Sequence, residues 1–235
     1  MIEHNNLIEI HDTLNPKIWS SDNTLREDVD IKLNEIVEQF AESIDIPLSI
    51  IDAHIVGSNA SYNYTAKSDL DLHCIVNYAR LDADPAVVEA WLWAQKKIFN
   101  DEYDISIRGI NVEIYVEDVR SATMSNGIYS LFNEEWIKFP EPIEAEINTF
   151  EINNEFMSLL PEVKKVLANG SLNDVEDMID QLYMIRRNGL AVDGEFGIGN
   201  QVFKAFRNYG YIDKLKDKVL ELRSKELSIF GARFK

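Results

Sequence analysis

The sequence from Leu48 to Asn77, LSIIDAHIVGSNASYNYTAKSDLDLHCIVN, carries the clearest structural pattern in the chain. Its first part, residues 48–57, is rich in Ile, Val and Leu and predicts a strand that ends at Gly57-Ser58. A short helix or turn is expected through Tyr64. Residues 69–77 predict a second strand, which opens with Asp69-Leu70-Asp71. The segment therefore predicts two strands with polar residues where one ends and the next begins.

Asp69 and Asp71 occupy alternate positions of the second predicted strand. Alternate residues of a strand point to the same face of a sheet, so the two carboxylates project together while Leu70 turns away. Adjacent carboxylates repel each other, and a bound divalent cation removes that cost. Hard cations such as Mg²⁺ bind carboxylate oxygens together with substrate phosphates. The pair therefore predicts a site for Mg²⁺ or Mn²⁺.

A third carboxylate and a glycine-serine pair extend this candidate site. Glu113 lies in a further predicted strand, residues 111–117, and would point toward the aspartates if the two strands are neighbours. Gly57 allows the backbone to approach a phosphate closely, and the Ser58 hydroxyl adds a donor. The short helix expected after them would direct its N–H groups toward a triphosphate.

The spacing of these residues resembles the signature of the DNA polymerase β-type nucleotidyltransferase superfamily. The longer context is similar to nucleotidyltransferases encoded by bacteriophages, both around LNPKIW at 14–19 and around Asn200, Phe203, Lys204 and Arg207. The resemblance implies a mixed, palm-type sheet flanked by helices, a nucleoside triphosphate donor and two Mg²⁺ ions. It also implies that Asp69 and Asp71 ligate both ions and that Glu113 ligates the catalytic one.

The remaining pattern predicts an α+β fold with a C-terminal helical domain. Residues 1–20 predict an arm with a turn at Asn15-Pro16, and residues 24–44 an amphipathic helix capped by Asp22 or Asn23. Asp84-Pro85 predicts the start of a helix that runs to about Asn100. Further strands are expected at 105–108, 111–117 and 127–132.

After Pro140 and Pro142 the apolar spacing becomes helical throughout. Helices are expected at 148–169, 173–188, 197–208 and 212–228. Breaks are expected at Gly170, at 189–194 and at Gly210, with Pro161 dividing or kinking the first helix. The predicted domains are a catalytic domain at 1–145, which includes the arm and first helix, and a helical domain at 146–235.

The net charge of −18 is distributed unevenly. Residues 1–150 contain 28 acidic and 10 basic residues, whereas residues 151–235 contain 13 of each. Long nucleic acids bind through many Lys and Arg contacts to phosphates, so such a partner is disfavoured. The charge fits a small substrate or a protein partner, and it equally fits a role in solubility alone.

Three basic residues are candidates for binding the triphosphate. Lys67 stands close before Asp69, and the alternative is a solvated loop lysine. Lys204 and Arg207 are three apart on one predicted helix and therefore share a face. They could hold phosphates in a cleft between the domains, or form ion pairs with the acidic half of the chain.

Histidine and aromatic side chains give weaker signals. His73 shares the face of Asp71 and could order a phosphate or an acceptor hydroxyl, bond a carboxylate, or be buried; His54 is expected to be structural. Tyr62, Tyr64 and Tyr129 either stack on a base or pack in the core.

The composition indicates a cytoplasmic protein, in the host cytoplasm if a phage encodes it. No apolar run approaches the ~20 residues that span a bilayer, and the N-terminus lacks a signal-like pattern. The single cysteine, Cys74, is expected to be buried.

The expected activity is transfer of a nucleoside monophosphate from a nucleoside triphosphate to a hydroxyl acceptor, with release of pyrophosphate. The acceptor is a small molecule or a protein, and the pattern assigns no oligomeric state. The alternative is a non-catalytic module of the same fold, which sequesters nucleotide or a protein or acts as an antitoxin-like partner of a small toxin.

Overall fold

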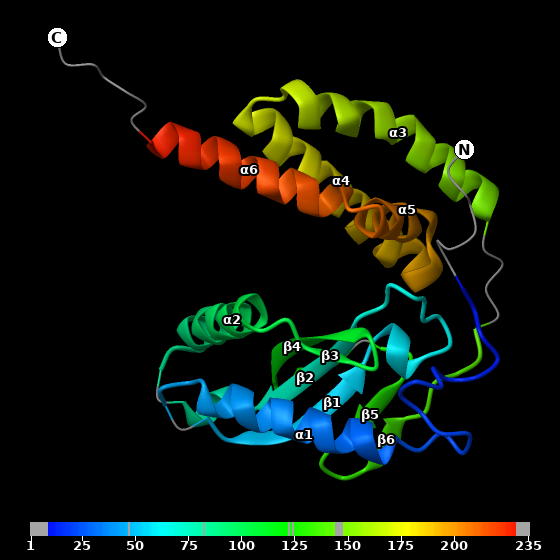
Figure 1. Ribbon diagram of the computed structural model, residues 1–235, viewed down its shortest axis with the longest axis vertical. Coiled ribbons are helices and arrows are strands. Elements are labelled where there is room, and N and C mark those ends of the chain that lie inside the picture. The colour runs from blue at the N-terminus through cyan, green and yellow to red at the C-terminus, as the bar shows by residue number, and fades with distance from the viewer. Residues whose placement is uncertain are drawn as a thin grey trace. The chain divides into compact units, whose positions relative to one another are not determined.

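The chain folds into two compact units, a sheet unit from Glu9 to Ile143 and a helical unit that follows it. A computed structural model describes residues 9–46, 48–81, 83–121, 123, 125–143 and 148–228. The predicted boundary at 145/146 and the first eight residues of the predicted arm lie outside the described residues. The fold is α+β, with one six-stranded mixed sheet and six α-helices in the described parts (Figure 1).

The sheet unit contains every strand predicted from the sequence, with each boundary within about two residues of its expected position. Its elements are α1 (Glu27–Glu42), β1 (Ile50–Val56), β2 (Leu70–Val76), α2 (Pro85–Glu102), β3 (Ser106–Ile107), β4 (Ile110–Asp118), β5 (Ile128–Ser130) and β6 (Glu135–Lys138). The strand β6 was not predicted, because its sequence EWIK is largely exposed and shows no clear alternation.

The strands are ordered β3-β4-β2-β1-β5-β6 across the sheet. β2 and β4 pair in parallel, and the other neighbouring strands pair antiparallel. A parallel pair cannot be joined by a hairpin. The chain therefore leaves β2, forms α2 and the short edge strand β3, and returns to pair as β4 (Figure 1).

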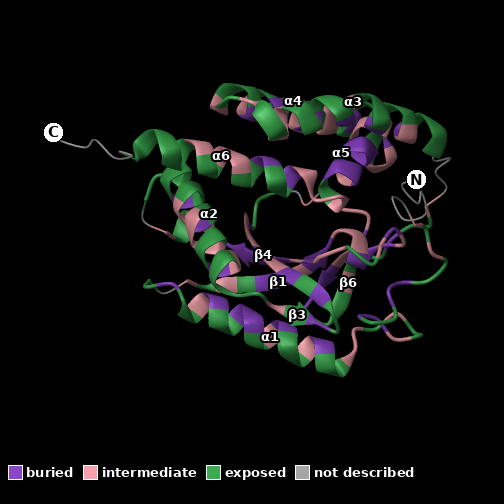
Figure 2. Cartoon of the chain, turned by 45° about the horizontal axis from the view of Figure 1, so that its top comes forward, coloured by how far each residue is buried: buried purple, intermediate pink, exposed green. Residues whose placement is uncertain are grey.

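One face of the sheet is covered by α1 and carries the core of the unit (Figure 2). The helix buries a stripe that includes Val29, Leu33 and Phe40, as its apolar spacing predicts. The predicted caps are wrong, because the helix starts later and its N-cap is Arg26, without a side-chain cap. Acidic residues in the first turn instead favour the positive end of the helix.

The helix α2 is attached to the edge of β4 beyond the short strand β3. Asp84 caps the helix as predicted, accepting a hydrogen bond from the Ala86 amide at 2.9 Å. Near its other end, Asn100 pairs with the backbone of Ile114: Nδ2 donates to the carbonyl at 2.9 Å and Oδ1 accepts from the amide at 3.1 Å. The Asn100 side chain thus makes the two backbone hydrogen bonds to Ile114 that a neighbouring strand would otherwise make.

The helical unit consists of four α-helices and one short 3-10 turn within the described residues. They are α3 (Thr149–Asn169), α4 (Leu172–Asp193), η3 (Gly194–Phe196), α5 (Ile198–Asn208) and α6 (Tyr211–Leu227). Pro161 does not divide α3, which continues through it. No helix in the described ranges has the length and apolar character that crossing a membrane requires.

The helix break predicted at 189–194 is wrong at Gly189, because α4 continues through this residue to Asp193 and ends at Gly194. A β-carbon on Gly189 would lie 2.6 Å from the backbone nitrogen of Asn200. The glycine therefore serves a close helix-to-helix contact and does not end the helix. Gly170 and Gly210 lie at helix ends as expected.

The replacement Asn100→Ala tests how strongly α2 is attached to β4. It leaves the Ile114 amide and carbonyl without these partners, so we expect unfolding free energy to fall by about 1–3 kcal/mol. All four tryptophans lie in the sheet unit, so urea unfolding followed by tryptophan fluorescence reports on this unit.

The matched control is Asn34→Ala, which removes the same amide from α1, where Asn34 bonds only to Asp30 one turn earlier. A change of no more than about 0.5 kcal/mol is expected there. Equal effects of the two replacements would contradict the role of Asn100.

Candidate functional site

Two carboxylates lie side by side near the centre of the sheet. The parallel register of β2 and β4 pairs Asp71 with Glu113, and neighbouring strands are about 4.8 Å apart. The residues on either side of each carboxylate are buried on the opposite face, so both carboxylates project away from the core. Asp69 lies directly before the first residue of β2. The neighbouring position of the two strands, on which the prediction for Glu113 depended, is confirmed.

Gly57 lies against the carboxylate of Asp71. Its backbone has φ 74° and ψ −157°, a combination that is essentially restricted to glycine. A β-carbon would lie 2.1 Å from Asp71 Oδ2. Besides the predicted approach to a phosphate, glycine therefore has a second function here: it leaves the space that the Asp71 carboxylate occupies.

The short helix expected after the glycine is a single 3-10 turn, Ser58–Ala60. Its middle residue, Asn59, is completely buried and was not predicted as part of the site. Its Nδ2 donates to the backbone carbonyl of Asp69 at 2.8 Å, and its Oδ1 accepts from Asn15 Nδ2 at 2.7 Å. The Trp19 indole donates to the Asn59 carbonyl at 2.7 Å. Asn59 thus fixes the start of β2 relative to the Gly-Ser turn.

Tyr115 lies two residues after Glu113 on the same face of β4. Its hydroxyl donates to Glu113 Oε2 at 2.6 Å. Burial raises the pKa of Tyr115, and the hydrogen bond and the charges of all three predicted carboxylates raise it further. The three acids therefore act on one phenol, which remains a hydrogen-bond donor at neutral pH.

Lys96 of α2 places a cation near two of these acids, Glu113 and Asp71. Its Nζ lies 4.0 Å from the centre of the Tyr115 ring. Burial lowers the pKa of Lys96, and the charges of Glu113 and Asp71 partly oppose that shift. The sheet unit therefore supplies a positive charge of its own at the site, and this residue was not predicted from the sequence.

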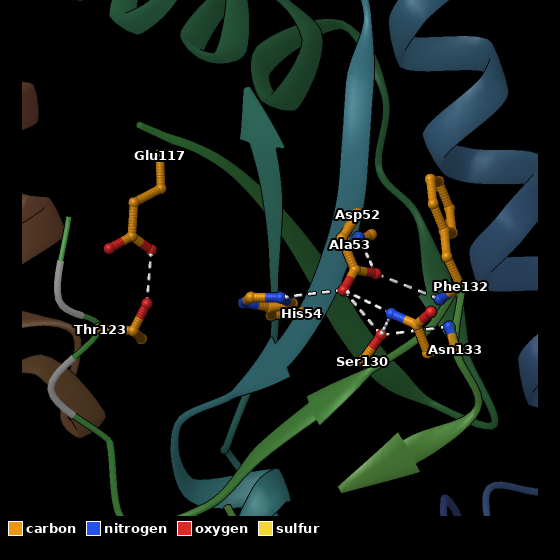
Figure 3. A network of polar contacts seen from close by, with 8 residues as sticks. All are labelled: Asp52, Ala53, His54, Glu117, Thr123, Ser130, Phe132 and Asn133. Carbon is orange, nitrogen blue, oxygen red and sulfur yellow. Dashed lines mark hydrogen bonds and ion pairs between the residues drawn. The ribbon is translucent and has the colours of Figure 1, made fainter. Parts of the chain in front are cut away.

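A hydrogen bond to a carboxylate was one of the alternatives predicted for His73. The structure shows such a bond, and its partner is Glu117. His73 Nδ1 lies 2.9 Å from Glu117 Oε2. The same oxygen accepts a hydrogen bond from Thr123 Oγ1 at 3.0 Å, and Figure 3 shows this second contact. Burial lowers the pKa of His73, and Glu117 opposes that shift.

Asp52 organises the network around His54 in Figure 3. Its carboxylate accepts from Ser130 Oγ at 2.7 Å, lies 3.1 Å from His54 Nε2, and accepts from Phe132 and Asn133. These contacts join β1 to the turn after β5. The structure therefore supports the structural interpretation of His54.

The three predicted phosphate-binding cations lie in different environments. Lys67 is exposed, two residues before Asp69. Lys204, on α5 of the helical unit, donates to Glu195 Oε1 at 3.1 Å within that unit, and Arg207 is exposed on the same helix. Phosphate binding by these residues stays a prediction.

The remaining candidates lie in packing positions. Burial raises the pKa of the Cys74 thiol to about 12, so it is a poor nucleophile. Tyr129 belongs to the core and Tyr62 packs against it. Tyr64 stacks on His11, with ring centres 3.9 Å apart.

The donor atoms suit a hard cation in kind. Three carboxylates without a thiol or imidazole are the ligands that Mg²⁺ and Mn²⁺ prefer, and the absence of a side chain at Gly57 makes room for the Asp71 carboxylate. Within the described part of the chain, no group of three or more His, Cys, Asp or Glu side chains is close enough to hold a metal ion. Asp71 and Glu113 are nevertheless register partners on adjacent strands.

No protein-family model matches the chain, and comparisons with curated proteins and with solved structures gave no match either. A functional assignment therefore depends on the residues and geometry of the site itself.

Replacement of Gly57 by alanine separates backbone strain from the contact with Asp71. Gly194 provides the matched control, because its backbone has φ 68° and ψ −155°, but among the described residues no atom beyond its chain neighbours lies within 4 Å of a β-carbon placed there. We expect both variants to lose about 1–3 kcal/mol of stability in thermal unfolding, since both force alanine into a glycine conformation.

Only Gly57→Ala is expected to weaken Mn²⁺ binding, measured by electron paramagnetic resonance of the free ion, because only there does the methyl group displace Asp71. Equal Mn²⁺ affinity in both variants would show that the space at Gly57 is irrelevant to the carboxylates.

Proposed function

We propose that this protein is a metal-dependent nucleotidyltransferase that moves a nucleoside monophosphate from a nucleoside triphosphate to a hydroxyl acceptor and releases pyrophosphate. The observation that carries the proposal is the register of β2 and β4, which sets Asp71 beside Glu113 with Asp69 two residues earlier. The Gly57-Ser58 turn adjoins this row, because Val56 pairs with Asp71.

In the proposed reaction an acceptor oxygen attacks the α-phosphorus of the triphosphate. A new P–O bond forms, the bond to the bridging oxygen of the β-phosphate breaks, and pyrophosphate leaves. The carboxylate of Glu113 takes the hydroxyl proton. Bound by Asp69, Asp71 and Glu113, two Mg²⁺ or Mn²⁺ ions would stabilise charge on the attacking and leaving oxygens. Ser58 and the backbone at Gly57 are proposed to orient the triphosphate.

The acceptor is proposed to be a small molecule or a protein hydroxyl. The first 150 residues contain 28 acidic against 10 basic residues, and long nucleic acids require the opposite balance. A single small or protein-borne hydroxyl needs no such basic surface.

The decisive experiment incubates the protein with each α-labelled nucleoside triphosphate and Mg²⁺ or Mn²⁺, and identifies every product by mass. We expect labelled adduct and pyrophosphate in equal amounts, and no turnover with EDTA. The double variant Asp69→Asn/Asp71→Asn should be at least about 10³-fold slower, since metal ions contribute several kcal/mol to such reactions.

The matched control is Glu135→Gln on the edge strand β6, a carboxylate-to-amide change at an exposed position, which should retain full activity. Undiminished pyrophosphate release by the double variant would refute the proposal. Nucleotide binding that depends on metal but yields no product would favour the non-catalytic module.

A further inference from the structure

The Tyr115 hydroxyl is held against one oxygen of Glu113. The 2.6 Å distance from Oη to Oε2 is that of a hydrogen bond between a hydroxyl and a charged carboxylate, which is about twice as strong as a neutral one. Because Tyr115 and Glu113 are alternate residues of β4, both side chains leave the same face of the strand. Both partners of this hydrogen bond therefore belong to one strand.

The Tyr115 ring is itself held on two sides. Lys96 Nζ lies 4.0 Å from its centre, within the range of a cation–π contact. The His73 ring, on the neighbouring strand, lies 4.9 Å away, as expected from the pairing of His73 with Tyr115 in the β2–β4 register. Contacts from α2 and β2 thus restrict the phenol to the orientation that reaches Glu113.

Glu113 needs such a restraint. Its register partner is another carboxylate, Asp71, and like charges at this spacing repel. A glutamate also has three rotatable bonds, so ordering it costs more entropy than ordering an aspartate. Without a donor on Oε2, repulsion and entropy would both turn Glu113 away from the other two acids.

We propose that Tyr115 is the positioning residue of Glu113: its hydroxyl engages Oε2 and leaves Oε1 as the oxygen that would bind a cation shared with the aspartates, while Lys96 contacts the ring. This inference rests on the proposed function, because it assigns Glu113 to a metal site. Tyr115 touches no reacting atom and acts only through the carboxylate.

The test measures Mn²⁺ binding without nucleotide, by electron paramagnetic resonance and calorimetry, for the wild type and for Tyr115→Phe. Loss of a hydrogen bond to a ligating carboxylate typically weakens metal affinity 10–100-fold, and a loss of about that size is expected. Lys96→Met should cause a smaller loss in the same direction, because the phenol stays but its ring is less restrained.

The matched control is Tyr78→Phe, which also deletes one phenol hydroxyl beside β4. That hydroxyl donates to the Val116 carbonyl at 3.3 Å and not to a carboxylate. Its Mn²⁺ affinity should stay within about twofold of wild type, since no ligand is disturbed.

A double-mutant cycle separates positioning from general structural support. If Tyr115 acts only through Glu113, Tyr115→Phe should cause no further loss of affinity in a Glu113→Gln background. A loss that adds fully to that of Glu113→Gln, or wild-type affinity in Tyr115→Phe alone, would overturn the inference.

The outcomes also distinguish this inference from the proposed function. Wild-type protein that binds Mn²⁺ with the expected cycle but forms no product refutes the transferase and keeps the role of Tyr115. Turnover in the wild type with unchanged Tyr115→Phe affinity refutes only the role of Tyr115. Absence of Mn²⁺ binding by the wild type without nucleotide refutes the role of Tyr115, and the product assay alone then decides the proposed function.

Discussion

The parallel pairing of β2 with β4 in a single register is the constraint on which the candidate site depends. Side chains alternate along a strand, so a shift of one residue would turn Asp71 into the core and bring Leu72 onto the polar face. The opposite face prevents that shift, because Leu70, Leu72 and Ile114 are at most 1% exposed. Packing against α1 on one face therefore fixes the carboxylates on the other.

This arrangement carries an electrostatic cost that nearby residues reduce. Asp71 and Glu113 would repel each other across one strand spacing. The Tyr115 hydroxyl and the Lys96 ammonium lie beside them, and Gly57 gives the Asp71 carboxylate room. The hydroxyl donor, the nearby ammonium and the space at Gly57 together accommodate two carboxylates on adjacent strands of the sheet.

Local periodicity was enough to predict most of the strands and helices and the face on which Asp71 and Glu113 lie. It failed where residues distant in the sequence meet. Tyr115 could have been found, since it follows Glu113 at the strand period. Asn59 and Lys96 could not, because their roles arise only when the Gly-Ser turn meets the start of β2 and when α2 docks on β4. Gly189 was misinterpreted for the same reason: its close contact with α5 gives no local signal.

The balance of charged residues between the two domains suggested that the helical domain supplies the cations that bind phosphate. The sheet unit, however, places Lys96 near the carboxylates. A charge count over 150 residues does not reveal a single ammonium close to the carboxylates. Such a group matters more than distant charges, because Coulomb interactions weaken with distance and with solvent screening. Three carboxylates and Lys96 leave a local charge of roughly −2, which attracts a divalent ion. Two such ions would reverse the sign to roughly +2 and so attract a triphosphate. If the proposed function holds, local electrostatics would therefore favour joint binding of metal and nucleotide, and Lys96 would lower the repulsion between the acids before they bind.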